Sequence, residues 1–191
     1  MLQTEKGKIW PWVVILITTA AAVFLLRYQG RLWLCACGQF YLWVGDAWSE
    51  NTSQHLLDSY SFTHVLHGFI FCWVITLLLP QLSRVRQLSL AVTAEAAWEV
   101  VENSALVINR YREATAAFGY NGDTIVNSLG DILMCSLGFV LARQIGFRRS
   151  LALFTAVEVV LLIWIRDSLL LNVVMLIHPM DWVKSWQSGL Y

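Results

Sequence analysis

Five long apolar segments constrain this chain more than any other feature of its sequence. They occupy residues 9–27, 62–80, 88–108, 124–145 and 151–177. A helix that crosses the hydrocarbon core of a bilayer needs about 20 apolar residues. Lipid admits only helices and closed barrels as spanning structures, and these segments lack the alternating pattern of barrel strands. We therefore expect an all-α fold, a polytopic membrane helical bundle of about five transmembrane helices.

The composition agrees with a single membrane domain. Hydrophobic residues make up 58% of the chain and charged residues only 14%, whereas soluble domains contain about 25% charged residues. No repeat or low-complexity linker divides the sequence, so residues 1–191 are expected to form one integral membrane domain, with a long first extramembrane loop over residues 28–61. The formal net charge of zero gives no indication of a nucleic-acid partner.

The positive charges that flank the segments predict an orientation. If the N-terminus is cytoplasmic, seven Lys and Arg residues lie on the inner side and five on the outer side. Cytoplasmic loops of membrane proteins carry the excess of positive charge. The sequence therefore favours a cytoplasmic N-terminus, which places the long first loop on the outer side.

The fifth segment contains a charged pair near its middle, Arg166 and Asp167. Two structures fit this pattern. One is a span that ends near Arg166 and is followed by a short helix over residues 168–176, and the other is one long tilted helix. The sequence does not choose between them.

The cysteines give weak signals. Cys35 and Cys37 form a C-x-C pair without the four-ligand spacing of a zinc site, and their role is left open. Cys72 and Cys135 lie inside apolar segments, where a free cysteine usually packs as a small hydrophobic residue.

Polar side chains converge on one end of four segments. In the predicted topology this end faces the outer side, because segments two and four begin there and segments three and five end there. Ionisable groups at membrane depth are costly and usually face the bundle interior or a water-filled cavity. The sequence therefore predicts one polar site, whose members are His55, Asp58, His64, His67, Glu102, Asn103, Arg110, Arg112, Asp123, Asn127, Arg166, Asp167, Asn172 and His178.

Helical spacing places several of these side chains on common faces. His64 and His67 are three residues apart, so they share a face of a helix. The carboxylates Glu95, Glu99 and Glu102 step by four and three and form one stripe. Asp123, Asn127 and Asp131 step by four, which gives a second polar stripe on the following segment.

The histidine cluster has three interpretations. Imidazole and carboxylate are good ligands for a divalent metal ion of the zinc or iron type, and the candidate ligands are His55, Asp58, His64, His67 and Asp131. Alternatively, the histidines form hydrogen bonds with carboxylates at a wet helix end. A third interpretation is direct acid–base catalysis, and the candidate catalytic residues are His64, His67, Glu99, Glu102 and Asp123.

The remaining polar residues also have competing interpretations. Glu95 and Glu158 lie deeper and are expected to be structural partners, and Asp123 is a candidate helix N-cap. Arginine matches phosphate oxygens in bidentate fashion, although an ordinary interfacial arginine is the plain alternative. The candidate substrate-binding residues are Arg110, Arg112, Asn127 and Arg166.

Several long motifs carry a family resemblance. They are SQHLLDSYSFTHVLHGF, EAAWEVVENS, INRYREAT, GYNGDTIVNSLGD and IRDSLLLNVVMLIHP, within a resemblance that covers residues 35–187. With these motifs the chain resembles the uncharacterised bacterial membrane family UPF0314 (domain of unknown function 2585). The resemblance implies a multi-pass protein of the bacterial inner membrane, and it carries no established activity.

A sparser pattern is similar to the VanZ-like membrane proteins. It consists of a histidine early in one span, a glutamate in the next, an arginine, and then D-x-x-x-N with a later glycine, which correspond to His64, Glu99 or Glu102, Arg110, Asp123, Asn127 and Gly138. This similarity implies a role in the cell envelope.

The leading functional hypothesis is a membrane-embedded enzyme that acts at the outer leaflet on a lipid or lipid-linked substrate. Hydrolysis or group transfer at a phosphate or acyl group is its most concrete form. One alternative is a small proton-coupled transporter, although the chain shows no inverted repeat. Another is a non-catalytic, VanZ-like envelope or assembly factor whose polar core fixes helix packing.

Overall fold

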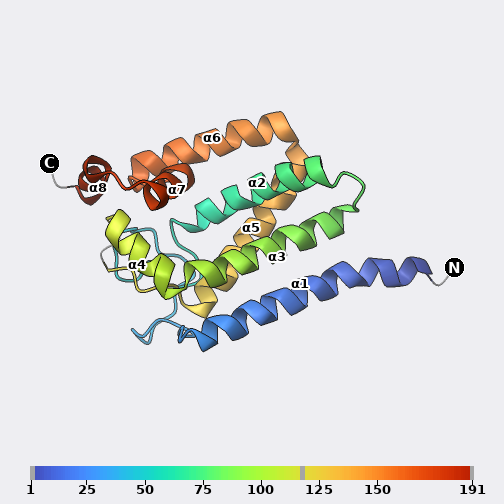
Figure 1. Ribbon diagram of the computed structural model, residues 1–191, viewed down its shortest axis with the longest axis horizontal. Helices are drawn as coiled ribbons and strands as arrows, with labels where there is room; N and C mark the ends of the chain where they lie inside the picture. The colour runs from blue at the N-terminus through green and yellow to red at the C-terminus, as the bar shows by residue number, and fades with distance from the viewer. Residues whose placement is uncertain (1–2, 117–118, 190–191) are drawn as a thin grey trace.

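The computed structural model describes residues 3–116 and 119–189, and these residues form a helical bundle (Figure 1). Within these ranges no strand occurs, apart from one isolated bridge between Val44 and Asp58. The prediction of an all-α fold is therefore confirmed. The helices are α1 (Gln3–Tyr28), α2 (Ser61–Leu78), α3 (Arg84–Glu102), α4 (Ala105–Ala114), α5 (Ile125–Ile145), α6 (Phe147–Trp164), α7 (Leu169–Ile177) and α8 (Asp181–Ser188).

Three of the described helices are long and apolar enough to cross a membrane, namely α1 over Ile9–Tyr28, α2 and α5. The pair of α6 and α7 adds a fourth crossing if the two helices together form one span, bent by 71° at their break. The chain is a multi-pass membrane protein. The expected number of five spans is approximate, since three or four are found in the described part of the chain.

The third apolar segment differs most from its prediction. It was expected to continue to residue 108, but α3 ends at Glu102 and a new helix, α4, begins at Ala105. The hydroxyl of Ser104 accepts a hydrogen bond from the backbone N–H of Val107 and so caps α4. A serine at this position favours a helix start over helix continuation, which explains the break.

The fifth apolar segment takes the first of its two predicted forms. Helix α6 ends at Trp164 and the short α7 begins at Leu169. The carboxylate of Glu158 accepts hydrogen bonds from the backbone N–H groups of Leu169 and Leu170, at 3.0 and 3.2 Å. These groups have no partner inside α7 because they belong to its first turn. Glu158 thus holds the bend together, in agreement with its expected structural role.

Helices α2 and α5 pack closely through glycines. A Cβ atom added to Gly68 would lie 2.1 Å from the carbonyl oxygen of Cys135, and one added to Gly138 would lie 2.2 Å from that of Val65. No other residue fits at such distances without moving the backbone. Beside this contact lies a buried apolar cluster that includes Leu66, Phe69, Phe139 and Phe154.

The loops and short helices gather at one end of the bundle. Figure 1 shows the loop between α1 and α2 together with α4, α7 and α8 at the end opposite the N-terminus. The loop is tied to the start of α5, because the backbone N–H groups of Ile125 and Thr124 donate to the carbonyls of Leu32 and Ser53, at 2.8 and 3.0 Å. We refer to this part of the molecule as the polar end.

Candidate functional site

Two histidines of α2 and one glutamate of α3 form the centre of the site. The Nδ1 atom of His64 lies 2.5 Å from Oε1 of Glu95. The Nδ1 atom of His67 lies 3.2 and 3.1 Å from the two oxygens of the same carboxylate. His64 and His67 therefore share a helix face, as their spacing predicts, and both imidazoles meet one buried carboxylate.

His64 also connects this centre to two further acidic side chains. Its Nδ1 atom lies 3.4 Å from Oε1 of Glu99 on α3, and its Nε2 atom lies 3.8 Å from Oδ2 of Asp131 on α5. Asp131 accepts a hydrogen bond of 2.8 Å from the hydroxyl of Ser61. Two helices, α3 and α5, thus bring three acidic groups to a single imidazole of α2.

The carboxylate of Glu99 lacks ordinary partners. The residue is fully buried, and neither of its oxygens has a hydrogen-bond partner among the described residues. A buried carboxylate that is neither paired nor protonated is strongly unfavourable. Its nearest cationic candidate is the imidazole of His64, which already contacts Glu95, so a proton or a bound cation would stabilise the cluster.

The distances in this cluster are close to those of a metal site. Two ligands that bind one zinc ion at about 2.0–2.1 Å in tetrahedral geometry lie about 3.4 Å apart. One ligand atom each from His64, His67 and Glu95 lies within 4.8 Å of the others, and the same is true of His64, Glu99 and Glu102. The contacts of His67 with Glu95, at 3.2 and 3.1 Å, are close to this spacing. The contact between His64 and Glu95, at 2.5 Å, would need to open by about 1 Å to admit an ion.

A second group of polar side chains lies beside the first, where α3 ends and α5 begins. Asn103 donates a hydrogen bond of 2.7 Å to Asp123 and accepts one from the backbone N–H of the same residue, also at 2.7 Å. The hydroxyls of Tyr120 and Tyr111 lie 3.0 Å from Asp123 and Glu102. Burial raises the pKa of Asp123, while the hydrogen bonds from Asn103 and Tyr120 act in the opposite direction.

The N-cap prediction for Asp123 is replaced by a different arrangement. The hydroxyl of Thr124 caps α5 by accepting a hydrogen bond from the backbone N–H of Asn127. Asp123 is thereby left to bind Asn103 and Tyr120. The neighbouring threonine performs the cap, which leaves the carboxylate available to the polar group beside the site.

Asp58 lies in the loop just before α2. Its two oxygens accept hydrogen bonds from the backbone N–H groups of Ser53 and Tyr60, at 2.6 and 2.8 Å. Burial raises the pKa of Asp58, and these two hydrogen bonds lower it by a smaller amount. Asp58 therefore shapes the loop as well as contributing acidity to the site.

A cavity of about 1400 Å³ opens onto these groups. Its lining includes both histidines of α2 together with Asp131 and Glu102, and it also includes many apolar side chains. Glu95 and Glu99 are not among the described residues that line it. The volume exceeds the roughly 300–1,000 Å³ of usual small-molecule pockets. The sequence-predicted residues on its wall are Asp58, His64, His67, Glu102, Asp123, Asp131, Arg166, Asp167 and Asn172. Its apolar lining includes Phe71, Ala97, Trp98, Val101, Leu169 and Val173.

Four other predicted site residues make structural contacts away from this wall. Arg110 donates a hydrogen bond of 2.7 Å to the carbonyl of Leu176 at the end of α7, and Arg112 donates one of 2.5 Å to the carbonyl of Tyr120. The side-chain amide of Asn127 donates to the backbone carbonyl of His55 at 2.9 Å. His55 itself lies beside Cys35 and Cys37, forming a cluster distinct from the one around His64.

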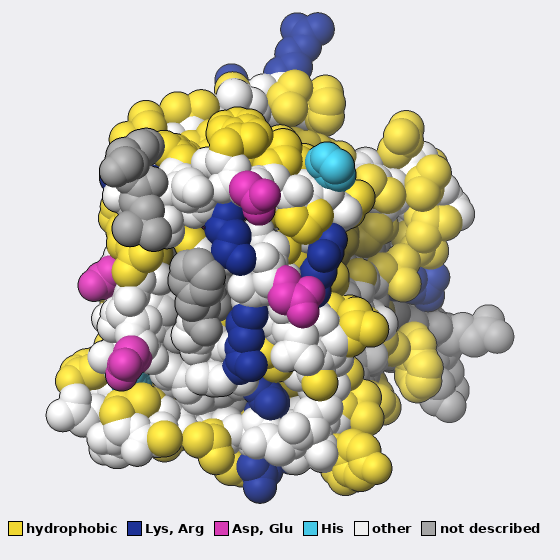
Figure 2. Space-filling view, turned by 60° about the vertical axis from the view of Figure 1, so that its left-hand side comes forward, with side chains coloured by type: hydrophobic (Ala, Val, Ile, Leu, Met, Phe, Trp, Pro, Cys, Tyr) yellow, Lys and Arg dark blue, Asp and Glu magenta, His cyan; other side chains and the backbone are white. Residues whose placement is uncertain are grey.

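The surface of the polar end carries charges of both signs. Figure 2 shows Lys and Arg side chains in a band across this face, with Asp and Glu side chains beside them. The basic side chains of this end donate hydrogen bonds to backbone carbonyls, so they hold its segments together; they are Arg31, Arg110, Arg112, Arg166 and Lys184.

Glu95 lies at the centre of the cluster. The sequence predicts a structural partner at this position, and the structure shows that its carboxylate contacts both His64 and His67. The stripe of three glutamates was a usable signal. The sequence could not show which glutamate faces the histidines, because that depends on how far α3 slides along α2.

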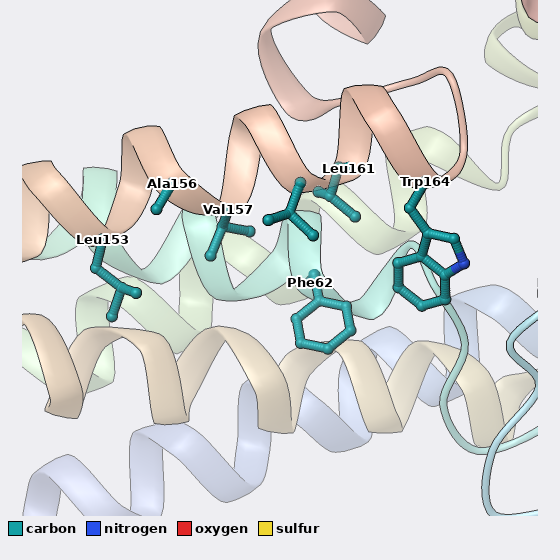
Figure 3. Close-up of a pocket in the computed structure, with 7 residues that line it drawn as sticks. Phe62, Leu153, Ala156, Val157, Leu161 and Trp164 are labelled. Atoms are coloured by element: carbon teal, nitrogen blue, oxygen red, sulfur yellow. The ribbon is translucent and has the colours of Figure 1, made fainter.

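A smaller hollow on the outer face of the bundle has no polar side chains. It encloses about 220 Å³ between α2 and α6 and is lined by Phe62, Leu153, Ala156, Val157, Val160, Leu161 and Trp164 (Figure 3). A hollow with this lining offers no acid, base or metal ligand.

The known proteins to which this chain is similar carry the same family name. The chain is similar to proteins named UPF0314 protein from Brucella anthropi (42% identical over 194 residues, 100% of this chain and 98% of the relative) and Sphingopyxis alaskensis (42% over 178 residues, 93% and 95%). One from Paracoccus denitrificans is 42% identical over 179 residues, 94% of this chain and 92% of the relative. No solved structure matches the chain.

A family model described as "Protein of unknown function (DUF2585)" matches residues 26–189. The similarity to VanZ-like proteins stays a prediction, since none of these matches bears on it. The family model covers more than half of the chain, and the chain matches these relatives over nearly their full length. This multi-pass bacterial membrane protein therefore belongs to the UPF0314 (DUF2585) family.

Proposed function

We propose that the protein is a membrane-embedded enzyme that hydrolyses, or transfers a group from, a lipid or lipid-linked substrate bound in the large cavity. The observation that carries this proposal is the combination of a His–His–Glu cluster with a cavity of about 1400 Å³ that is polar at one part and apolar at another. A substrate with a charged head and an apolar tail matches such a lining.

The apolar wall supports a lipid-like substrate. Phe71 and Trp98 line the cavity together with His67, and the Trp98 ring lies 6.0 Å from the His67 ring in an edge-to-face arrangement. Ligand sites usually combine predominantly apolar walls with a few precisely placed polar groups. A lipid whose acyl chain enters between α2 and α3 would have its polar head next to the imidazoles.

The chemistry assigned to the cluster is that of a divalent metal. His64, His67 and Glu95 would hold the ion. Glu99, which has no hydrogen-bond partner among the described residues, would neutralise the charge of the ion or complete its coordination. Imidazole nitrogen and carboxylate oxygen suit zinc and non-haem iron. Such an ion polarises a phosphoryl or acyl oxygen and lowers the pKa of a bound water to near 7, which generates a nucleophile.

The polar residues around the cluster would orient the substrate. Arg166 lines the cavity and is the basic side chain proposed to face the anionic part of the substrate. Asp123 and Glu102 also line it and are candidates for accepting a proton from the attacking group. We further propose that the site faces the periplasmic side of the inner membrane, as the charges flanking the spans predict.

Metal content and lipid composition test this proposal together. Purified wild-type protein is expected to contain about one equivalent of zinc or iron per chain by elemental mass spectrometry, and a His67→Ala strain is expected to lose the metal and accumulate a lipid species. The matched control is His178→Ala, because His178 is exposed and does not line the cavity. Unchanged lipids and absence of bound metal in the wild type would refute the proposal.

A flux assay distinguishes the enzyme from a transporter. Protein reconstituted in liposomes with candidate lipids is expected to form product in the presence of zinc and to produce no proton flux. Proton or solute flux without product formation would instead favour the proton-coupled transporter, which uses the same histidines and carboxylates as a relay.

A further inference from the structure

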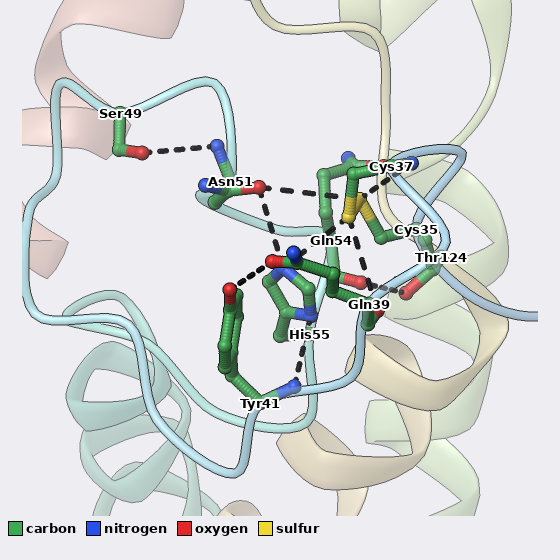
Figure 4. Close-up of a disulfide and its surroundings, with 9 residues drawn as sticks. All are labelled: Cys35, Cys37, Gln39, Tyr41, Ser49, Asn51, Gln54, His55 and Thr124. Atoms are coloured by element: carbon green, nitrogen blue, oxygen red, sulfur yellow. Dashed lines mark hydrogen bonds between the residues drawn. A yellow bond between two sulfur atoms is a disulfide. The ribbon is translucent and has the colours of Figure 1, made fainter.

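We propose that Cys35 and Cys37 form a redox-active disulfide that oxidises dithiols by thiol–disulfide exchange, assisted by His55. This activity is independent of the proposed metal centre, since its residues lie in the loop between α1 and α2. The two cysteines form a disulfide (Figure 4), and both are among the residues that line the large cavity.

The position of this disulfide argues against a purely structural role. It joins residues only two apart, and a disulfide restricts the unfolded chain least when it closes so short a loop. Cys37 is exposed and Cys35 is half-buried, so a thiol in solution can reach the bond. By contrast, the free thiols of Cys72 and Cys135 are buried.

Each sulfur has an N–H group beside it that can stabilise a thiolate. The backbone N–H of Cys37 donates to Sγ of Cys35 at 3.1 Å. The Nε2 atom of His55 lies 4.0 Å from Sγ of Cys37 and 3.3 Å from Oδ1 of Asn51. Hydrogen bonds to a sulfur favour its thiolate form and so favour its departure.

The hydrogen bonds of His55 fix which nitrogen carries the proton. Its Nδ1 atom accepts a hydrogen bond of 3.2 Å from the backbone N–H of Tyr41. A neutral imidazole then carries its proton on Nε2, the atom that faces Asn51 and Cys37. His55 is 1% exposed, and its carbonyl is held by Asn127 of α5, so the ring is a fixed donor.

The exchange balances in two steps. A thiolate of the partner dithiol attacks Sγ of the exposed Cys37, the bond between Cys37 and Cys35 breaks, and the electron pair leaves on Sγ of Cys35 near the Cys37 N–H. The second thiol of the partner, once deprotonated, attacks the partner sulfur of this mixed disulfide. Cys37 then leaves as a thiolate that accepts from Nε2–H of His55. The partner loses two electrons and two protons and becomes a disulfide, while Cys35 and Cys37 become thiols.

A redox titration of the full-length protein in detergent tests whether the disulfide between Cys35 and Cys37 is redox-active. The protein is equilibrated with reduced and oxidised dithiothreitol at a series of ratios, quenched with acid, labelled with N-ethylmaleimide and analysed by mass spectrometry. We expect the peptide of Cys35 and Cys37 to pass between no label and two labels in one reversible two-electron transition. Cys72 and Cys135 are free thiols that the acid quench exposes, so their labelling is expected to be the same at every ratio.

Three results of the titration would overturn the proposal. Two labels on the pair at every ratio would mean that no disulfide forms. Resistance to reduction until the protein unfolds would mean that the bond is structural. A stoichiometric metal ion retained after reduction would mean that Cys35, Cys37 and His55 are metal ligands. These results concern the loop alone and leave the test of the His64 centre unaffected.

The rate of reduction by dithiothreitol tests the role of His55. In His55→Ala we expect reduction about tenfold slower or more, the effect of losing a hydrogen bond to a charged group, with a dithiothreitol adduct accumulating on Cys37. His55→Gln retains an amide donor and is expected to restore part of the rate, and His178→Ala is expected to match wild type. Release of Cys37 at the wild-type rate in His55→Ala would contradict the proposal. The redox titration uses the wild-type protein, so its result does not depend on whether a variant folds.

Discussion

The imidazole of His64 and the carboxylate of Glu95 meet across the contact of α2 with α3, with Nδ1 and Oε1 2.5 Å apart. Both side chains are buried, at 8% and 0% exposure. A buried histidine–carboxylate contact can fix an imidazole for proton transfer or support a metal ion.

Removing the charge of Glu95 tests the metal centre directly. Glu95→Gln keeps the size of the side chain but removes the anionic ligand, so we expect zinc affinity to fall by about 10- to 100-fold or more. The measurement is zinc competition against a chelator in detergent. Glu113→Gln, which changes an exposed glutamate of α4, should bind zinc as the wild type does. Equal affinity in Glu95→Gln and wild type would exclude Glu95 as a ligand.

Filling the cavity tests the substrate site without touching the cluster. Ala97 lines the apolar wall, and Ala97→Trp is expected to abolish lipid co-purification and product formation while metal content stays at the wild-type level. Native mass spectrometry and elemental analysis give the two readouts. Leu133→Trp enlarges an exposed side chain of α5 and should leave both unchanged. Undiminished lipid binding in Ala97→Trp would show that the substrate does not bind in this cavity.

Gly68 tests the close packing that brings α2 and α5 together. A Cβ at this position would lie 2.1 Å from a backbone oxygen of α5, so Gly68→Ala is expected to lower the free energy of unfolding by about 1–3 kcal/mol or more. Thermal unfolding in detergent measures the loss. Gly119→Ala, with no atom within 4 Å of the added Cβ, is the control. Equal stability of the two variants would show that α2 and α5 can move apart at little cost in free energy.

Asp123 predicts a specific pH dependence of stability. Burial raises its pKa in the folded protein, so the folded state retains this proton to higher pH than the unfolded chain, in which the pKa is about 3.9. Its contribution to the free energy of unfolding is complete below that value and is lost as pH rises through the raised pKa.

Asp123→Asn removes this titration while retaining an acceptor for Asn103. The unfolding temperature of the variant is expected to depend less on pH between pH 4 and 8, and to exceed that of the wild type by a growing margin as pH rises. Parallel curves for the two proteins would mean that Asp123 titrates normally.

Helix patterning predicted the architecture well because it depends on local chemistry. Apolar length identified α1, α2 and α5, and the spacing of His64 and His67 placed both rings on one face of α2. The break at Ser104 was missed because a capping hydroxyl inside an apolar run is also compatible with a continuous helix. The bend after α6 was foreseen as one of two forms, and Glu158 decided between them by binding the first N–H groups of α7.

The site was predicted in part. Convergence of polar groups on one end of the bundle correctly brought His64, His67 and Asp131 together. Arg110 and Asn127 were assigned to the substrate, yet they hydrogen bond to backbone carbonyls of α7 and of the loop before α2. A donor's choice between a ligand and a neighbouring carbonyl depends on where the loops run, which a linear pattern does not encode.

The sequence by itself determined that this is a helical membrane protein of the UPF0314 family with a shared polar end, because apolar length, helical period and long motifs are properties of consecutive residues. Only the tertiary structure decided that Glu95 meets both histidines and that His55 belongs with Cys35 and Cys37. The first pairing depends on how α3 slides and rotates against α2, and the second on the course of the loop between α1 and α2. Glycine contacts between backbones fix the register of α2 against α5.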